Sequence, residues 1–421
     1  MKKVHTDYIP QLAQIEQAAK KLKSVVTHTP LMLNLTYSEK YGAKIFFKRE
    51  DLQVVRSYKI RGAFNKISGL SLEKNKRGVV CASAGNHAQG VAYSCQLLKV
   101  KATIFMPSPT PRQKVEQVRF FGKEFVEIVL VGDTFDDAQL EALSYCKETD
   151  GIFIHPFDDE KVIEGQGTVG LEILQDSEAA IDYLFLPVGG GGLASGVSTV
   201  FKVLSPKTKI IGVEPAGAPA MQNSIDQGQN LKLSKIDKFV DGAAVQQIGD
   251  KTFEICRNNL DEVVTVPEGL VCTTMLELYN RDAIVVEPAG ALAVSALVQF
   301  AEEIKGKHVV CVLSGSNNDI SRTEEIRERS LLYEGLKHYF IVRFPQRAGA
   351  LKEFLVDVLG PNDDIVHFEY TKKTAREKGP ALIGIEHRTR EDFAPLIKRI
   401  TDKNINAEYL NERPDLFGFI I

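Results

Sequence analysis

The chain has 421 residues, of which 44% are hydrophobic and 25% are charged. These shares are typical of a globular protein and exclude a disordered, collagen-like or disulfide-stapled chain. At about 150 residues per domain, the length predicts two or three domains. The 52 Lys and Arg residues nearly balance the 55 Asp and Glu residues, leaving a net charge of −3. This balance argues against a nucleic-acid or membrane partner recognised by charge and favours small-molecule partners.

The six cysteines are scattered, with no C-x-x-C pair and no histidine pair at zinc spacing, so we expect reduced, mostly buried thiols. The segment Met1 to Asp7 lacks the apolar stretch of a signal peptide, and no run of 18 apolar residues occurs. These observations predict a cytoplasmic protein.

Short apolar runs alternate with amphipathic stretches between residues 44 and 314. The runs predict strands at 44–48, 79–82, 102–106, 125–131, 152–155, 183–188, 209–214, 263–266 and 309–313. Helices are expected among them at 86–98, 111–121, 136–148 and 194–204. This alternation is typical of βαβ units, so we predict an α/β body with two sheets or one long one and a cleft between lobes.

The pattern changes at a charged helix predicted for residues 322–336. After it we expect a strand at 339–344, a helix at 348–359, strands at 365–370 and 381–387, a helix at 393–402 and a strand at 407–410. The order β-α-β-β-α-β is that of a ferredoxin-like α+β unit. It predicts a separate C-terminal domain.

The first segment whose residues could take part in a reaction runs from Ser57 to Ala63. Ser57 suits the N-cap of a helix, which places Lys59 and Arg61 in its first turn. Since the helix dipole disfavours cations there, we expect an anionic group nearby. Lys59 is either a solvated lysine or an amine with a lowered pKa that attacks a carbonyl.

The second segment follows the predicted strand at 79–82 and opens the predicted helix at 86–98. Ser83, Ala84, Gly85, Asn86 and His87 offer backbone N–H groups suited to a carboxylate or phosphate, although a plain strand-to-helix turn explains them too. His87 alone is more often structural than catalytic.

A run of four glycines follows the strand at 183–188. Gly189, Gly190, Gly191, Gly192 and Leu193 favour close approach of a ligand, such as a phosphate, to the main chain. The spacing Gly189-x-Gly191-x-x-Ala194 with Glu214 downstream also fits a loose dinucleotide-binding fingerprint.

Ser314 follows the last strand of the α/β body, either as a ligand-binding residue or as a simple helix cap. Open α/β sheets bind ligands at the carboxyl ends of their strands, so we expect all four segments to converge on one crevice.

Together the four segments closely resemble the motifs of pyridoxal-phosphate enzymes of the tryptophan-synthase-β type, and within these the threonine dehydratases. The motifs that carry the resemblance are Ser57 to Ala63, Ala82 to Gly90, Val188 to Leu193, and Leu313 to Gly315. The resemblance implies a two-lobed α/β catalytic body of fold type II at residues 1–320, with a smaller lobe at about 54–158. It further implies a linker helix at 321–336 and an ACT-like ferredoxin-like regulatory domain at 337–421.

The same resemblance implies a role for each matching residue. Lys59 forms the covalent bond to pyridoxal 5'-phosphate and acts as the catalytic base. Asn86 binds the ring hydroxyl, Gly189 to Leu193 hold the phosphate, and Ser314 faces the pyridine nitrogen. The loop Ser83 to His87 holds the substrate carboxylate.

The implied activity is removal of water from L-threonine, giving 2-oxobutanoate and ammonia, as the first step of isoleucine biosynthesis. An L-serine dehydratase, another β-eliminating or β-replacing enzyme such as a cysteine synthase, and a non-catalytic amino-acid sensor remain alternatives. Serine racemases, which resemble this chain, carry a second serine where Ala84 stands, so elimination is favoured over racemisation.

The resemblance also implies a homotetramer or homodimer that is feedback-inhibited by isoleucine. Arg347 and Gly349 lie in a strand-to-helix turn that is either an effector loop or a plain turn. We expect no required metal ion, because Ala216, Ala218 and Ala220 follow Glu214 where a divalent-ion site would need further acids.

Overall fold

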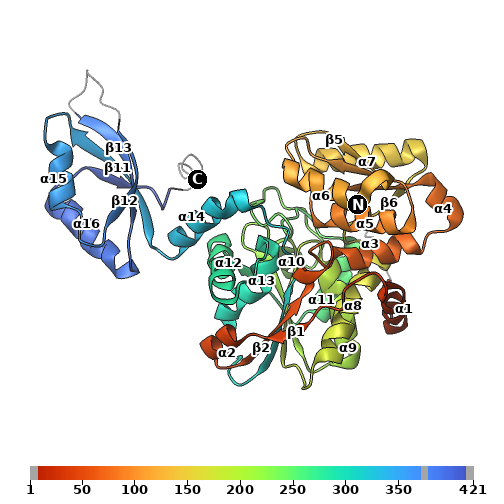
Figure 1. Ribbon diagram of the computed structural model, residues 1–421. Helices are drawn as coiled ribbons and strands as arrows, with labels where there is room; N and C mark the ends of the chain where they lie inside the picture. Colours follow the sequence, from red (N-terminus) through yellow and green to blue (C-terminus); the bar gives the residue numbers. More distant parts are fainter. Residues whose placement is uncertain (1–7, 371–377, 414–421) are drawn as a thin grey trace. The chain divides into compact units, whose positions relative to one another are not determined.

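The computed structural model describes residues 8–370 and 378–413 (Figure 1). Residues 1–7, 371–377 and 414–421, which the sequence prediction assigned to the first and last domains, lie outside the described part. The chain divides into two compact units, Met1–Asp319 and Ile320–Ile421. Within the described residues, every helix is too short or too polar to cross a membrane.

The first unit contains two sheets. The sequence predicts either two sheets or one long one, and the first of these arrangements is found. The larger sheet has the strand order β1-β2-β10-β7-β8-β9, in which β1 is antiparallel to β2 and the other neighbours are parallel. Its strands are β1 (Leu31–Leu33), β2 (Lys44–Arg49), β7 (Tyr183–Pro187), β8 (Lys209–Pro215), β9 (Glu262–Val266) and β10 (His308–Leu313). The sequence prediction missed β1, since three residues are too few to show a period of two.

Helices cover both faces of this sheet, which explains why its central strands are apolar throughout. Residues Leu184 to Pro187 of β7 and Val309 to Leu313 of β10 are all buried. The helices are α1 (Leu12–Leu22), α2 (Leu35–Tyr41), α8 (Glu160–Asp176), α9 (Gly192–Leu204), α10 (Ala220–Gln227), α11 (Asp250–Asn259), α12 (Glu268–Asp282) and α13 (Pro288–Ser295).

The smaller sheet is parallel, with the order β5-β4-β3-β6. Its strands are β3 (Val79–Ala82), β4 (Ala102–Met106), β5 (Val126–Leu130) and β6 (Ile152–Phe153). The helices of this part of the chain are α3 (Lys59–Ser68), α4 (Leu72–Arg77), α5 (Asn86–Leu98), α6 (Arg112–Gly122) and α7 (Phe135–Thr149). In Figure 1 this orange and yellow group lies beside the larger sheet as a second lobe.

The second unit contains one antiparallel sheet with the order β12-β13-β11-β14. The elements are α14 (Thr323–Tyr333), β11 (Lys337–Pro345), α15 (Ala350–Asp357), β12 (Asp364–Tyr370), β13 (Lys378–Glu386), α16 (Phe393–Asp402) and β14 (Ala407–Tyr409). Phe340, Phe354 and Leu396 meet in its core, which lies between sheet and helices. The β-α-β-β-α-β order and the placement of the first strand inside the sheet confirm the predicted ferredoxin-like unit.

Candidate active site

The four sequence segments lie at carboxyl ends of parallel strands. Ser83 follows β3, Gly189 follows β7 and Ser314 follows β10, whereas Lys59 opens α3 beyond the end of β2. Contacts between these segments show that they converge. The N–H of Tyr58 donates to the carbonyl of Ser314 at 3.2 Å, and the segments around Ser57 and Gly315 form an isolated antiparallel bridge.

Helix α3 begins at Lys59, so Lys59 and Arg61 do lie in its first turn. The prediction that Ser57 caps this helix is wrong, because Tyr58 occupies the N-cap position and no side chain caps the helix. Ser57 is instead drawn into the bridge to Gly315, and its buried hydroxyl has no hydrogen-bond partner within the described residues.

The Lys59 amine points toward the segment that leads out of the smaller sheet. Its Nζ donates to the carbonyl of Pro156 at 2.9 Å. Burial lowers the pKa of Lys59 to about 8, and the carboxylate of Glu287 partly opposes this shift. A substantial fraction of Lys59 is therefore neutral near pH 8, which a nucleophile or general base requires.

The anionic groups expected beside the first turn of α3 are the protein's own carboxylates. Arg61, fully buried, donates to Glu50 at 2.7 and 2.8 Å and to Glu172 at 2.6 Å. The buried Lys48 also contacts Glu172, at 2.7 Å. This network anchors α3 to β2 and α8, so Arg61 supports the helix that carries Lys59.

The loop from Ser83 to His87 offers backbone groups. Gly85 is the N-cap of α5, no side chain caps that helix, and a Cβ atom on Gly85 would meet nothing within 4 Å. Ser83 Oγ accepts from the N–H of Gly85 at 3.2 Å. Open space before an uncapped helix N-terminus suits a carboxylate.

The ring of His87 is a structural group. Its Nε2 donates to the carbonyl of Ile154 at 2.8 Å, and burial lowers the pKa of His87 to about 3. Only its backbone N–H is available for a ligand. Ala84, by contrast, has no titratable group to offer.

The side chain of Asn86 meets two residues that sequence reasoning missed. Its Nδ2 donates to Glu287 at 2.6 Å, and its Oδ1 accepts from Nδ2 of Asn317. Burial, with Asp241 adding to it, raises the pKa of Glu287 to about 7. A lone carboxylate in the apolar run from Ile284 to Ala296 was the available sequence signal, since such a group is expected to be buried and partnered.

The four glycines are packed by protein atoms. A Cβ atom on Gly190 would lie 2.2 Å from the ring of Phe157, and one on Gly192 would lie 3.0 Å from the same residue. Gly189 faces Ala243 in the same way, and Gly191 has a φ of 87°. The explanation that close approach of a ligand demands these glycines is therefore incomplete, because neighbouring segments already demand them.

The glycine run nevertheless ends at a helix start that a phosphate would suit. Gly191 is the N-cap of α9, and no side chain caps the helix. Leu193 is buried in the first turn. Since Phe157 follows the Pro156 that binds Lys59, the loop also lies next to the amine.

Ser314 is almost fully buried, with 3% of its surface exposed. Its Oγ donates to the carbonyl of Ala289 at 3.2 Å, so it does not cap a helix. A contact of that length is weak, and the hydroxyl retains lone pairs for a second partner.

The dinucleotide interpretation is wrong. Glu214 is fully buried, and its carboxylate accepts the N–H groups of Met221 and Gln222 at 2.8 and 2.9 Å, near the start of α10. Burial raises the pKa of Glu214 to about 8. It is a helix-capping residue that no ribose reaches. Across residues 8–370 and 378–413, no group of three or more His, Cys, Asp or Glu residues is arranged to hold a metal ion.

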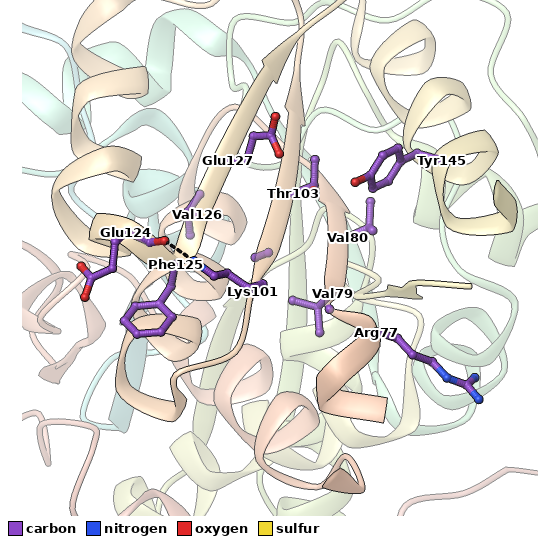
Figure 2. A pocket seen from close by; sticks show the side chains of 12 residues that line it. Arg77, Val79, Val80, Lys101, Thr103, Glu124, Phe125, Val126, Glu127 and Tyr145 are labelled. Carbon is purple, nitrogen blue, oxygen red and sulfur yellow. Dashed lines mark hydrogen bonds between the residues drawn. The ribbon is translucent and has the colours of Figure 1, made fainter. Parts of the chain in front are cut away.

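A hollow in the first unit lies away from the candidate site. Its volume is about 390 Å³, and it is lined by residues at the amino ends of β3, β4 and β5, including Val79, Thr103 and Glu127 (Figure 2). The candidate site is at the opposite, carboxyl ends. Lys101 and Arg77 at this hollow are engaged with the carbonyl of Glu124 and with Asp150.

In the second unit, Arg347 and Gly349 line a hollow of about 220 Å³ with Phe344, Leu351, Phe368 and Tyr370. Gly349 is the N-cap of α15, with a φ of 87° and no side-chain cap. Arg347 pairs with Glu353 at 2.6 Å.

The residues at the site fit pyridoxal phosphate. An uncapped helix start follows the glycines, the buried hydroxyl of Ser57 lacks a partner in the described chain, and Lys59 has a lowered pKa. A family model described as pyridoxal-phosphate-dependent enzyme matches residues 22–315. A second model, described as the C-terminal regulatory domain of threonine dehydratase, matches residues 328–420. Fold and site thus define a pyridoxal-phosphate-dependent enzyme of fold type II with a C-terminal regulatory domain.

Similar proteins of known name identify the family within this class of enzymes. The chain is 59% identical over 411 residues to a biosynthetic L-threonine dehydratase of Halalkalibacterium halodurans, covering 98% of this chain and 99% of that protein. It is 56% identical to the corresponding protein of Bacillus subtilis, covering 98% and 97%. The chain therefore belongs to the biosynthetic threonine dehydratases. This confirms the resemblance and the fold class drawn from the sequence.

Solved structures agree with this assignment. The processed form of threonine deaminase isoform 2 from Solanum lycopersicum is 40% identical, with a TM-score of 0.72 over 76% of this chain and 95% of that chain. Maize serine racemase is 30% identical, with a TM-score of 0.71 over 77% and 99%.

Proposed function

We propose that this chain removes water from L-threonine with the help of pyridoxal phosphate, yielding 2-oxobutanoate and ammonia for isoleucine biosynthesis. The observation that carries the proposal is the convergence of Lys59, Asn86, Ser314 and the glycine loop through the contacts described above. Close identity to biosynthetic threonine dehydratases supports threonine as the substrate.

The cofactor would be held from four directions. The N–H groups of Gly189 to Leu193 at the start of α9 suit the phosphate, which needs no basic side chain at a helix N-terminus. The amide of Asn86 would suit the ring oxygen, the hydroxyl of Ser314 would suit the ring nitrogen, and the amine of Lys59 would hold the aldehyde carbon. When bound, the cofactor supplies an electron sink that stabilises negative charge at Cα of the substrate.

When its amine is free of the cofactor, Lys59 would act as the general base. Its pKa of about 8 leaves neutral amine available near that pH, and the carbonyl of Pro156 holds Nζ in place. The loop from Ser83 to His87 would orient the substrate carboxylate at the uncapped start of α5 through the N–H groups of Ala84, Asn86 and His87. The N–H groups of Ser83 and Gly85 already donate to the carbonyl of Phe105 and to Ser83 Oγ. Because Ala84 provides no acid on the other side of the substrate, elimination is favoured over racemisation.

The test replaces Lys59 and measures 2-oxo acid formation from threonine and from serine. Lys59→Ala should abolish turnover and the covalent cofactor absorbance. Lys66→Ala, which changes another lysine of α3 bound to Asp159, should retain both. Retained turnover in Lys59→Ala contradicts the assigned base, and a strong preference for serine supports the serine dehydratase alternative instead.

We further propose that isoleucine binds the hollow at Arg347 and Gly349. Arg347 and the uncapped start of α15 suit the carboxylate of an amino acid, and Phe344, Leu351 and Phe368 suit a branched aliphatic side chain. Arg347→Ala should raise the isoleucine concentration needed for half inhibition and leave uninhibited activity unchanged. Inhibition that survives deletion of all residues beyond 335 contradicts this location.

The chain is also proposed to form a homodimer or homotetramer in the cytoplasm. Met32, Leu33 and Leu35, on or next to the edge strand β1, are 46–74% exposed, which is typical of an association surface. The six cysteines are free thiols, five of them buried, as expected in a reducing compartment. Light scattering should give a mass of two or four chains, and a single-chain mass contradicts the proposal.

We propose that the activity requires no divalent ion, because the carboxylate of Glu214 already accepts hydrogen bonds from backbone N–H groups of α10. Activity should persist after dialysis against a chelator, and its loss and recovery on adding Mg²⁺ would overturn this.

A further inference from the structure

The side chain of Asn86 is held from two sides by residues of different segments. On one side its Nδ2 donates to Oε1 of Glu287 at 2.6 Å. On the other side its Oδ1 accepts from Nδ2 of Asn317. Asn317 lies three residues beyond Ser314, and its Nδ2 also donates to the carbonyl of Val55 at 3.0 Å.

These partners leave one orientation for each amide. The carbonyl of Val55 only accepts, so the nitrogen of Asn317 must face it and therefore also faces Oδ1 of Asn86. The carboxylate of Glu287 accepts from Asn86 and from the backbone N–H of Asn317. A rotated Asn86 amide would set oxygen against carboxylate and nitrogen against nitrogen.

The arrangement uses one N–H of Asn86 and leaves the other uncommitted in these contacts, since a primary amide has two. We propose that Asn317 is a positioning residue for the reaction, which keeps this remaining N–H of Asn86 directed as a donor toward the cofactor ring. The proposal rests on the cofactor-binding role of Asn86 proposed above. Asn317 acts through Asn86 and touches neither cofactor nor substrate.

The neighbouring residue of the same segment provides a matched control. Ser316 Oγ donates to the carbonyl of Asp51 at 3.1 Å, and no contact to Asn86 is recorded among the described residues. Ser316→Ala therefore removes a hydrogen bond of the same segment without disturbing the Asn86 amide.

A double-mutant cycle tests the proposal, with the cofactor dissociation constant of the apoprotein as the readout. Asn317→Ala should weaken binding about tenfold, as expected for the loss of one partner in a buried network. In an Asn86→Ala background the same change should have almost no further effect, because its target is gone. Ser316→Ala should bind as tightly as the unaltered chain.

Asn317→Asp separates orientation from packing, because it keeps the shape of the side chain. Its carboxylate would face Oδ1 of Asn86, so it should weaken binding more than Asn317→Ala does. It should also shift the pH dependence of the bound cofactor's absorbance, whereas Ser316→Ala should not. A merely structural Asn317 would make the aspartate the milder variant and leave the spectrum unchanged.

Three results would overturn the proposal: unaltered cofactor binding in Asn317→Ala, effects that multiply in the double variant, or a milder aspartate variant. If Asn86→Ala itself binds cofactor normally, the proposed role of Asn86 fails, and the role of Asn317 fails with it. If Asn86→Ala weakens binding and Asn317→Ala does not, only the positioning role fails.

Discussion

Gly90 lies against the backbone of Lys59, since a Cβ atom at position 90 would come within 3.1 Å of the Lys59 carbonyl carbon. Gly90 belongs to α5, the helix that begins at Asn86, and Lys59 is the first residue of α3. The two helices that present the proposed cofactor-binding side chains thus touch at a position where only a hydrogen atom fits. Their separation sets the distance between the amine and the asparagine amide.

Gly90→Ala should therefore damage the site. The obstructing atoms are backbone, so the helices must move apart by a few tenths of an ångström, and we expect a loss of about 1–3 kcal/mol in stability. Cofactor affinity should fall with it, measured by titration of the apoprotein. Gly69→Ala, where the nearest atom would lie 3.5 Å away at the end of the same α3, should be near neutral. Equal behaviour of the two variants would contradict this packing account.

The pKa of Lys59 predicts how the apoprotein takes up its cofactor. Only the neutral amine attacks an aldehyde. Because burial lowers the pKa of Lys59 to about 8, the rate of covalent bond formation should rise with pH, pass its midpoint near 8 and level off above it. An ordinary lysine would continue to gain rate through about pH 10. Stopped-flow absorbance measures the rate, and N-acetyl-lysine as the amine corrects for ionisation of the cofactor.

Glu287→Gln should lower that midpoint, because the carboxylate of Glu287 raises the pKa of Lys59. A midpoint that stays near 10 in the unaltered protein would contradict the buried environment of the amine.

We expect replacement of Arg61 to lower the stability of the protein, although Arg61 takes no direct part in the reaction. Arg61→Ala leaves the buried carboxylate of Glu50 without its cation and leaves Glu172 with Lys48 alone, which should cost about 3–5 kcal/mol. Arg61→Lys should lie between, since an ammonium lacks the planar fork that contacts both carboxylates. Urea unfolding of the apoprotein measures both. Arg112→Ala, which breaks an exposed pair with Glu116, should change stability by less than about 1 kcal/mol.

Gly190 separates two reasons for a glycine in the phosphate loop. Gly190→Ala should push the ring of Phe157 aside and weaken cofactor binding by about tenfold. Adding Phe157→Ala removes the obstructing ring, so the double variant should regain most of the affinity relative to Phe157→Ala alone. If no affinity returns, the ligand rather than Phe157 requires the glycine.

Much of this molecule follows from local sequence. The apolar runs located β2 to β10 to within a few residues, and the C-terminal unit was predicted element by element, because strand and helix periods are properties of short segments. Lys59, Asn86, the glycine loop and Ser314 were found because small or chemically reactive residues directly follow predicted strands or stand just before predicted helices.

Residues defined by long-range contacts could not be found in this way. Glu287 lies 201 positions from Asn86, and Asn317 lies 231 positions from it. The N-cap of α3 was misplaced at Ser57 because capping preference is local, whereas its bridge to Gly315 forms only in the folded chain. Likewise, the anion expected near Arg61 could not be identified as Glu50 and Glu172 without the fold.

Asn317 lies only two residues before Asp319, where the first unit ends. This short distance affects how the activity of a truncated enzyme should be interpreted. In a protein cut after Asp319, the Cα atom of the residue that bears the new terminal carboxylate would lie at most about 7 Å from the Cα atom of Asn317. That extra negative charge would stand close to Glu287, whose pKa is already raised by burial and, to a lesser degree, by Asp241. A cut beyond residue 335 keeps the new terminus farther along the chain, and so separates loss of regulation from an electrostatic disturbance of the cofactor pocket.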